Sequence, residues 1–282
     1  MLDCAIIGTG PAGLSAALNL KLHEKDFVWF GSPANSDKVG KSEKIANYPG
    51  MGLLSGAELN EKFRAHAEVM GIEITDRMVT TIMPMGDYYA LLADNEMYEA
   101  KTLLMATGVV AGKGFENEKE LLGRGVSYCA TCDGFLYKGK TIAVFCGAKR
   151  YEHEVEYLAG LAEKVYLSTG YKDCGIDLPN VEKVGAIRTV NGEKRVAGIT
   201  LQDGTAIEVS GLFCLRTAVA PTTLLPRLAM EGPHIVVNRA QETNLPGCFA
   251  AGDCTGRPYQ IAKAVGEGNV AADSIVKYLA AK

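Results

Sequence analysis

The chain has 282 residues, a formal net charge of −4 and 48% hydrophobic residues. This length suits two domains that each bury their own core, and a mildly acidic balance without a clustered basic face argues against nucleic acid as a partner. No apolar run reaches the roughly 18 residues that a membrane span needs, and no signal peptide precedes the first apolar segment. We therefore expect a cytoplasmic protein without a membrane partner.

The first expected elements are a strand over residues 3–7, a glycine-rich turn, and a helix with leucines along one face over residues 14–22. In the turn, Gly8 permits a tight bend, Gly10 lets a pyrophosphate approach the backbone, and Gly13 lets helix and strand pack closely. The position of this motif between a strand and a helix favours a dinucleotide site over an ordinary glycine turn.

A second strand is expected over residues 27–30, at the spacing of a right-handed parallel crossover. In the usual fingerprint an acidic residue after this strand binds the ribose, but Gly31 stands here and the nearest downstream acid is Asp37. Ribose contacts must therefore come from other residues, for which Phe30, Ser32 and a lysine-containing loop are candidates. The loop lysines are Lys38, Lys41 and Lys44.

Two later strands end in residues that suit a ligand. Residues 102–105 run into Ala106-Thr107-Gly108, and residues 248–251 run into Gly252-Asp253. Ligands of open parallel sheets bind at the carboxyl ends of the strands. The sequence therefore predicts that both strand ends contribute to the same site as the glycine-rich turn.

Between these two strands a new strand over 141–145 and a helix over 152–162 begin a second βα unit, as an inserted domain would. The expected fold class is α/β, with two Rossmann-like, doubly wound, three-layer domains, the second inserted in the first. The first domain is expected over 1–112 and 233–282, and the inserted domain over 113–232.

Redox chemistry is indicated by residues 129–134, which read CATCDG. Cys129 and Cys132 are within disulfide reach, and Asp133 can supply the proton that a leaving thiolate needs. A structural CxxC or half of a metal site is the alternative, and Asp133 equally suits a helix cap or turn. The other cysteines are scattered, so no disulfide framework is indicated, and Cys254 is expected to be a small buried residue.

Five segments in order resemble the low-molecular-weight thioredoxin reductases: GTGPAG, ANYPG, MATG, GVSYCATCDGF, and LPGCFAAGDC followed by YQIAKAVGEG. The resemblance spans the whole chain and implies an FAD cofactor, no metal, a homodimer, and a disulfide centre at Cys129, Cys132 and Asp133. It also implies that Asn47 and Gln260 lie near the flavin ring. The implied FAD-binding residues are Gly8, Gly10, Pro11, Ala12, Gly13, Asn47, Ala106, Thr107, Gly108, Gly252, Asp253, Gln260 and Ile261.

The second glycine fingerprint, GxGxxA, of the NADPH-dependent members is missing. Cys146, Ala148 and Tyr151 stand at its positions, so both the tight turn and the anion cradle should be lost. The next strand runs into residues 168–172 without the His-Arg-Arg clamp for a 2′-phosphate, and the second ATG-like turn reads Leu215-Arg216-Thr217. The inserted domain is therefore expected to be a degenerate NAD(P)H-binding fold.

Among relatives that keep CATCDG and lose these motifs, the chain most resembles the ferredoxin-dependent flavin thioredoxin reductases. That resemblance implies that ferredoxin supplies electrons one at a time, that FAD passes them in pairs to the Cys129–Cys132 disulfide, and that the dithiol reduces thioredoxin. Because the disulfide must meet both the flavin and thioredoxin, rotation about the segments near Gly112 and Gly232 is expected.

Three alternatives remain open. An NADPH-dependent enzyme could hold the phosphate with Lys149 and Arg150 instead of a glycine loop. A dithiol oxidase of the same fold would run the chemistry backwards and hand electrons to oxygen. A non-catalytic FAD-binding sensor would keep the insert only as a binding surface.

Overall fold

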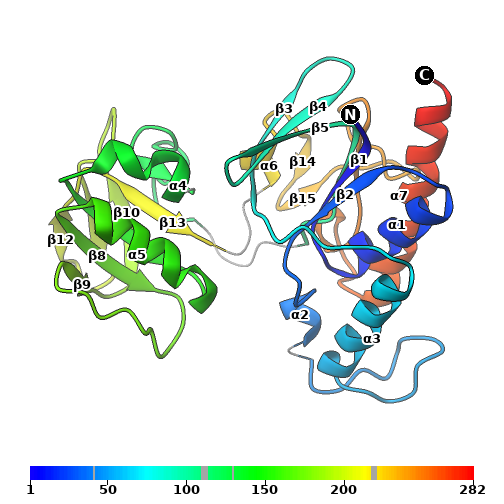
Figure 1. Cartoon of the computed structure of the whole chain (residues 1–282), viewed down its shortest axis with the longest axis horizontal. Coiled ribbons are helices and arrows are strands. Elements are labelled where there is room, and N and C mark those ends of the chain that lie inside the picture. The colour runs from blue at the N-terminus through cyan, green and yellow to red at the C-terminus, as the bar shows by residue number, and fades with distance from the viewer. Residues whose placement is uncertain (41, 109–113, 129, 217–220) are drawn as a thin grey trace. The chain divides into compact units, whose positions relative to one another are not determined.

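The computed structural model describes residues 1–40, 42–108, 114–128, 130–216 and 221–282. The chain divides into two compact units, and each contains its own sheet (Figure 1). Unit 1 is Met1–Val110 with Ala220–Lys282, and unit 2 is Ala111–Val219. This mixed architecture of helices and parallel sheets confirms the expected α/β fold class.

The described strands of unit 1 form a six-stranded sheet of order β2-β1-β5-β4-β3, with β16 also paired to β5. The strands are β1 (Leu2–Ile7), β2 (Phe27–Phe30), β3 (Val79–Pro84), β4 (Tyr89–Ala93), β5 (Glu96–Met105) and β16 (Cys248–Ala250). β1 runs parallel to β2 and β5. The first half of β5 pairs antiparallel with β4, and its second half pairs parallel with β16. The carboxyl ends of β1, β5 and β16 therefore meet at one edge.

Helices α1 and α7 pack against each other in unit 1 (Figure 1). The elements outside the sheet are α1 (Pro11–Leu22), α2 (Asp37–Gly40), α3 (Gly56–Val69), α6 (Pro221–Leu224), β14 (Met230–Glu231), β15 (His234–Ile235), the 3-10 helix η3 (Asp253–Thr255) and α7 (Ile261–Ala280). A Cβ on Gly268 of α7 would lie 2.2 Å from the Ala12 carbonyl oxygen of α1, so small residues make this contact. The helix expected here with leucines along one face is α1, and Leu22 at its end is 69% exposed. None of the described helices is both long and apolar enough to span a membrane.

The described strands of unit 2 form a parallel sheet of order β6-β13-β7-β8-β9 and a three-stranded antiparallel sheet, β10-β11-β12. The strands are β6 (Val126–Ser127), β7 (Thr141–Cys146), β8 (Lys164–Thr169), β9 (Val181–Lys183), β10 (Ile187–Asn191), β11 (Gly198–Leu201), β12 (Ala206–Glu208) and β13 (Leu212–Leu215). The helices are α4 (Ala130–Asp133), η1 (Gly134–Tyr137), η2 (Lys149–Tyr151) and α5 (Glu152–Leu161).

Both faces of the parallel sheet are covered. Ile142 and Val144 of β7 pack into a core that includes residues of α5. Ala143 between them packs with Ile199 of β11 in a second core. Burial on both faces explains why β7 and β13 read as continuous apolar runs.

The second boundary between the units lies earlier than expected. The inserted domain was expected to continue to residue 232, but unit 2 ends at Val219. The reason is that α6 packs against β3 and β14 pairs with β15, which places residues 221–232 in unit 1. The first expected boundary, at 112/113, and Gly112 itself lie outside the described residues.

Candidate functional site

Three predicted segments meet where β1, β5 and β16 end. A Cβ on Gly8 would lie 2.2 Å from the Ala106 carbonyl oxygen, and a Cβ on Gly13 would lie 2.0 Å from that of Gly8. Gly252, at φ +91°, lies so close to α1 that its Cβ would be 3.0 Å from the Ala12 Cβ. Only glycine fits these approaches, so the glycine-rich turn, the end of β5 and the end of β16 form one compact site.

The middle glycine of the turn has a different environment. No atom of the described residues lies within 4 Å of a Cβ built on Gly10. Gly10 precedes α1 without a side-chain cap, and the first turn of α1 has no acidic residue, so its N–H groups suit an anion. The buried Thr107 Oγ1 has no hydrogen-bond partner within the described part of the chain. These features fit a dinucleotide whose phosphates sit against the turn.

Two sets of contacts that sequence reasoning missed hold this site in place. Trp29 Nε1 donates a 2.9 Å hydrogen bond to the Gly8 carbonyl oxygen. Lys263 Nζ donates to the carbonyl oxygen of Gly252 at 2.8 Å, while Glu267 Oε2 accepts from the Gly252 N–H at 2.8 Å. The i,i+4 spacing of Lys263 and Glu267 predicts an ion pair on α7. The sequence does not indicate that both residues also bond to Gly252.

The structure brings Asn47 and Gln260 together. Asn47 Nδ2 donates a 2.8 Å hydrogen bond to Gln260 Oε1, and Gln260 directly precedes Ile261, the first residue of α7. The loop that carries Asn47 is closed by two backbone hydrogen bonds between Ile45 and Leu54. Both side chains thus lie on unit 1, at the start of the helix that also supports Gly252.

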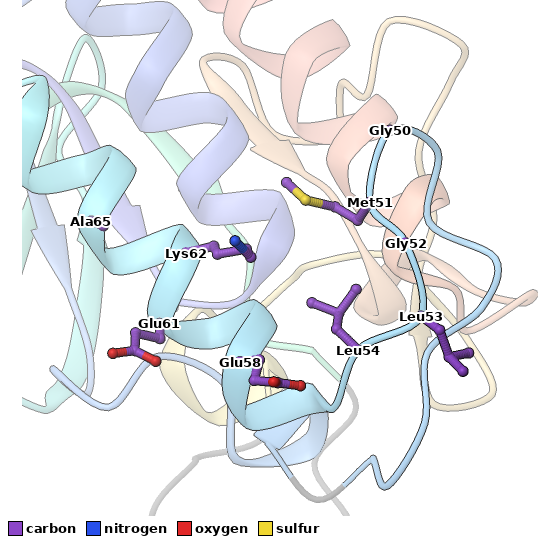
Figure 2. A pocket seen from close by; sticks show the side chains of 9 residues that line it. All are labelled: Gly50, Met51, Gly52, Leu53, Leu54, Glu58, Glu61, Lys62 and Ala65. Atoms are coloured by element: carbon purple, nitrogen blue, oxygen red, sulfur yellow. The ribbon is translucent and has the colours of Figure 1, made fainter.

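The same loop borders a hollow of about 680 Å³ against α3 (Figure 2). Its lining residues are Gly50, Met51, Gly52, Leu53, Leu54, Glu58, Glu61, Lys62 and Ala65. None of the predicted site residues lines this hollow. We therefore assign it no part in the chemistry.

One of the three loop lysines reaches a predicted site residue. Lys38 Nζ lies 2.5 Å from Asp253 Oδ2 and 4.5 Å from the centre of the Tyr259 ring. Lys44 is exposed, and Lys41 lies outside the described residues. Lys38 is therefore the positive charge that the lysine loop contributes at this edge of the sheet.

The redox segment begins directly after β6 in unit 2. Cys129 and the side chain of Cys132 lie outside the described residues. α4 and η1 pack on α5, where a Cβ on Gly134 would be 3.1 Å from Leu158. Asp133 precedes η1 but makes no side-chain cap hydrogen bond to it, so the interpretation of Asp133 as a cap of that helix is not supported.

Side chains fill the end of β7, where a nucleotide fingerprint would lie. Tyr151 is buried; its hydroxyl donates to the Arg216 carbonyl oxygen at 3.0 Å and accepts from Arg150 Nη2 at 2.7 Å. Cys146 Sγ donates to the Ala148 carbonyl oxygen at 3.3 Å. The turn therefore bonds to itself and to the end of β13.

Negative charge replaces the phosphate clamp. The first turn of α5 carries Glu152 and Glu154, which oppose an anion at that helix start. Glu152 Oε1 accepts hydrogen bonds from Gly175 N–H at 2.9 Å and Tyr171 OH at 2.7 Å, and these lower the pKa of the Glu152 carboxyl. Burial and this hydrogen bond raise the pKa of Tyr171. A carboxylate therefore stays ionised beside residues 171–175, just after the end of β8.

Buried thiols make unfolding pH-dependent, and three of them lie in unit 1. Burial raises the thiol pKa of Cys254 to about 11 and of Cys4 and Cys248 to about 12. Their contribution to stability is fully present below the unfolded thiol pKa of about 8.5 and is lost as the pH rises toward the folded values. We expect the free energy of unfolding to lose about 1.4 kcal/mol per pH unit for each thiol above that point.

Urea unfolding between pH 7 and 10.5 measures this slope. Cys254→Ala should reduce the slope relative to the unsubstituted chain, because one raised thiol pKa has been removed. Equal slopes in the two proteins would contradict the expectation. The burial of Cys254, whose Sγ donates to the Met105 carbonyl oxygen at 3.2 Å, is as the sequence predicted.

Comparison with known proteins identifies the family of this chain. The sequence profile of the pyridine nucleotide-disulphide oxidoreductases matches residues 2–149 and 164–268. The chain belongs to this family. As a pyridine nucleotide-disulphide oxidoreductase of the low-molecular-weight thioredoxin reductase type, it is an FAD-binding flavoprotein, which confirms the expected family and cofactor.

Relatives within the pyridine nucleotide-disulphide oxidoreductases span the whole chain. The thioredoxin reductase of Helicobacter pylori is 32% identical over 99% of both chains, and that of Aquifex aeolicus is 33% identical over 99% of this chain and 94% of its own. A solved ferredoxin-flavin thioredoxin reductase from Clostridium acetobutylicum is 44% identical with a TM-score of 0.93, over 99% of this chain and 98% of that one. The chain is therefore a flavoprotein disulfide oxidoreductase of thioredoxin reductase type.

Proposed function

We propose that this chain is a ferredoxin-dependent thioredoxin reductase that does not use NADPH. In this proposal unit 1 binds FAD, and unit 2 is a degenerate NAD(P)H-binding domain that carries the Cys129–Cys132 disulfide. The protein acts in the cytoplasm as a homodimer, with ferredoxin as electron donor and thioredoxin as substrate.

Side chains fill the end of β7 in unit 2, which supports the proposal that the enzyme does not use NADPH. In a parallel sheet the nucleotide phosphates would sit at the end of β7 and the start of α5. There the buried Tyr151 closes the turn, and Glu152 and Glu154 repel a phosphate. Arg150, one of the two residues that could replace the glycine loop, already donates to the Tyr151 hydroxyl at 2.7 Å. The likeness to the Clostridium ferredoxin-flavin enzyme agrees with this interpretation.

The glycine-rich turn and the ends of β5 and β16 are the proposed FAD site. The N–H groups at the start of α1 bind the pyrophosphate, Gly252 and Asp253 bind the ribitol and pyrophosphate, and Asn47 and Gln260 orient the flavin ring. When bound there, FAD would supply the redox chemistry that converts single electrons into the pair that a disulfide needs. Lys263 and Glu267 keep the Gly252 turn in place.

The cysteine pair carries the two electrons onward. Two electrons break the Cys129–Cys132 bond, and with two protons, one of them through Asp133, the pair becomes a dithiol. One thiolate then attacks the thioredoxin disulfide and forms a mixed disulfide, which the second thiol resolves, so that thioredoxin leaves as a dithiol and the Cys129–Cys132 bond is restored. The exposed Phe135 (62%) and Leu136 (53%), just after the pair, suit a protein substrate.

Anaerobic flavin absorbance tests the electron donor. We expect bleaching by chemically reduced ferredoxin and none by NADPH or NADH, because the nucleotide phosphates lack a cradle. Bleaching by NADPH would contradict the proposal and would mean that Lys149 or other residues rebuild a nucleotide site. Rapid reoxidation by air in the presence of a small dithiol would instead identify a dithiol oxidase.

A further inference from the structure

A buried carboxylate outside every predicted motif holds three partners in unit 2. The Glu118 side chain is only 2% exposed. Its oxygens accept hydrogen bonds from the Phe115 N–H at 2.7 Å, from Arg216 Nη2 at 2.8 Å and from the Tyr128 hydroxyl at 2.8 Å. Burial of a carboxylate is unfavourable unless such donors replace its water. Glu118 is therefore the fixed centre of a small polar network.

Arg216 ties this network to the middle of the parallel sheet. It directly follows β13, which lies between β6 and β7. Its guanidinium carbon lies 4.6 Å from the centre of the Phe115 ring and 5.2 Å from that of Phe145, and the two rings meet edge to face. Aromatic rings attract a guanidinium, so stacking and the ion pair together fix its position.

Tyr128 is the arm of the network that reaches the redox segment. It follows β6, which pairs with β13 through only two residues, and it directly precedes Cys129. Burial, and then the charge of Glu118, raises the pKa of Tyr128, so the phenol stays protonated and keeps donating. The short β6 strand ends just before Tyr128. The hydrogen bond of the Tyr128 hydroxyl therefore adds a second attachment of the chain directly before the cysteine pair.

We propose that Tyr128, held by Glu118 and Arg216, is a positioning residue for the redox pair. Its hydrogen bond fixes the chain at Tyr128, the residue directly before Cys129, so the backbone reaches the redox pair from a fixed point. Thiol–disulfide exchange depends on which sulfur is presented and on its access, so a free backbone at this point lowers the rate. The inference rests on the proposed disulfide function.

Tyr128→Phe tests the role in the FAD-loaded protein. The substitution keeps the ring and the Glu118–Arg216 ion pair and removes only the hydroxyl. The control is Tyr98→Phe, which removes a tyrosine hydroxyl bonded to Glu96 at 3.1 Å in unit 1. Each protein is reduced with dithiothreitol, freed of excess reductant and mixed with oxidised thioredoxin, so that no ferredoxin is needed.

We expect the maximal exchange rate of Tyr128→Phe to fall about tenfold or more, since one lost hydrogen bond to a charged group corresponds to roughly 10- to 150-fold. The thioredoxin concentration at half-maximal rate should stay unchanged, and Tyr98→Phe should match the unsubstituted protein. A folded Tyr128→Phe with an unchanged maximal rate but a lower melting temperature would overturn the proposal, since the network would then act only on stability.

Two further measurements separate the possible failures. If Tyr128→Phe does not fold, Arg216→Lys keeps a positive charge beside Glu118 but loses the planar stacking, and the same fall in maximal rate is expected. If the unsubstituted protein fails to reduce thioredoxin, the proposed function and the positioning role are both overturned. An active protein that is insensitive to both substitutions would overturn the positioning role alone.

Discussion

Cys132→Ser should lower the rate of thioredoxin reduction by at least about a thousandfold, because loss of one member of a concerted catalytic set removes nearly all turnover. Serine cannot form the disulfide that accepts the electron pair, and it cannot resolve a mixed disulfide. The flavin should still be bleached by reduced ferredoxin, since unit 1 is unchanged. Steady-state turnover with excess reduced ferredoxin, alongside flavin absorbance, measures both steps.

Cys174→Ser is the matched control for this substitution. Cys174 is a partly exposed free cysteine of unit 2 that the proposed reaction does not use. We expect it to retain full turnover. A Cys132→Ser protein that binds its partners normally and still turns over would show that the CxxC pair is not the electron carrier. Retained partner binding with lost turnover would exclude the sensor alternative.

Gly10→Ala should weaken FAD binding without weakening the fold. An alanine fits the extended backbone of Gly10, and its Cβ meets no atom of the described residues. The methyl group would instead stand where the pyrophosphate approaches, and the loss of about one hydrogen bond to a charged group, about 1.5–3 kcal/mol, corresponds to roughly 10- to 150-fold in Kd. Equilibrium titration of the apoprotein with FAD measures the change.

Substitutions of two other glycines serve as controls for Gly10→Ala. Gly13→Ala should lose both FAD binding and thermal stability, because its Cβ would lie 2.0 Å from the Gly8 carbonyl oxygen. Gly266→Ala on α7 has open space around its Cβ and should keep both. If Gly10→Ala bound FAD as tightly as Gly266→Ala does, the proposed phosphate position would be wrong.

The parts of the fold with local signals were predictable from the sequence. The strand over residues 27–30 was predicted with the bounds that β2 has, and β1, β7 and α5 agree within one residue at each end. Each is a dense apolar run or an amphipathic helix next to a turn. The β3–β4 hairpin and the β10–β12 sheet were missed because their strands are short or polar on one face, although turn signals stand between the strands: Gly86-Asp87, Asn191-Gly192 and Asp203-Gly204.

The supports of the site were not predictable, because they join residues far apart in the chain. Glu118 and Arg216 are 98 positions apart, and no sequence motif around either residue indicates that they form an ion pair. Similarly, Lys263 appears in the sequence as one more helix lysine, although it holds the Gly252 turn. The glycines of the first turn were predictable, because a tight turn between a strand and a helix requires residues without a Cβ.

The pairing of β16 with the second half of β5 has a consequence for biosynthesis. The sheet that supports the glycine-rich turn needs residues 248–250, and α1 needs α7 as its packing partner. Unit 2, in contrast, is one continuous stretch that can fold while the ribosome is still making the rest. We therefore expect the redox half to be folded first, and the nascent chain to take up FAD only when its last helix has emerged.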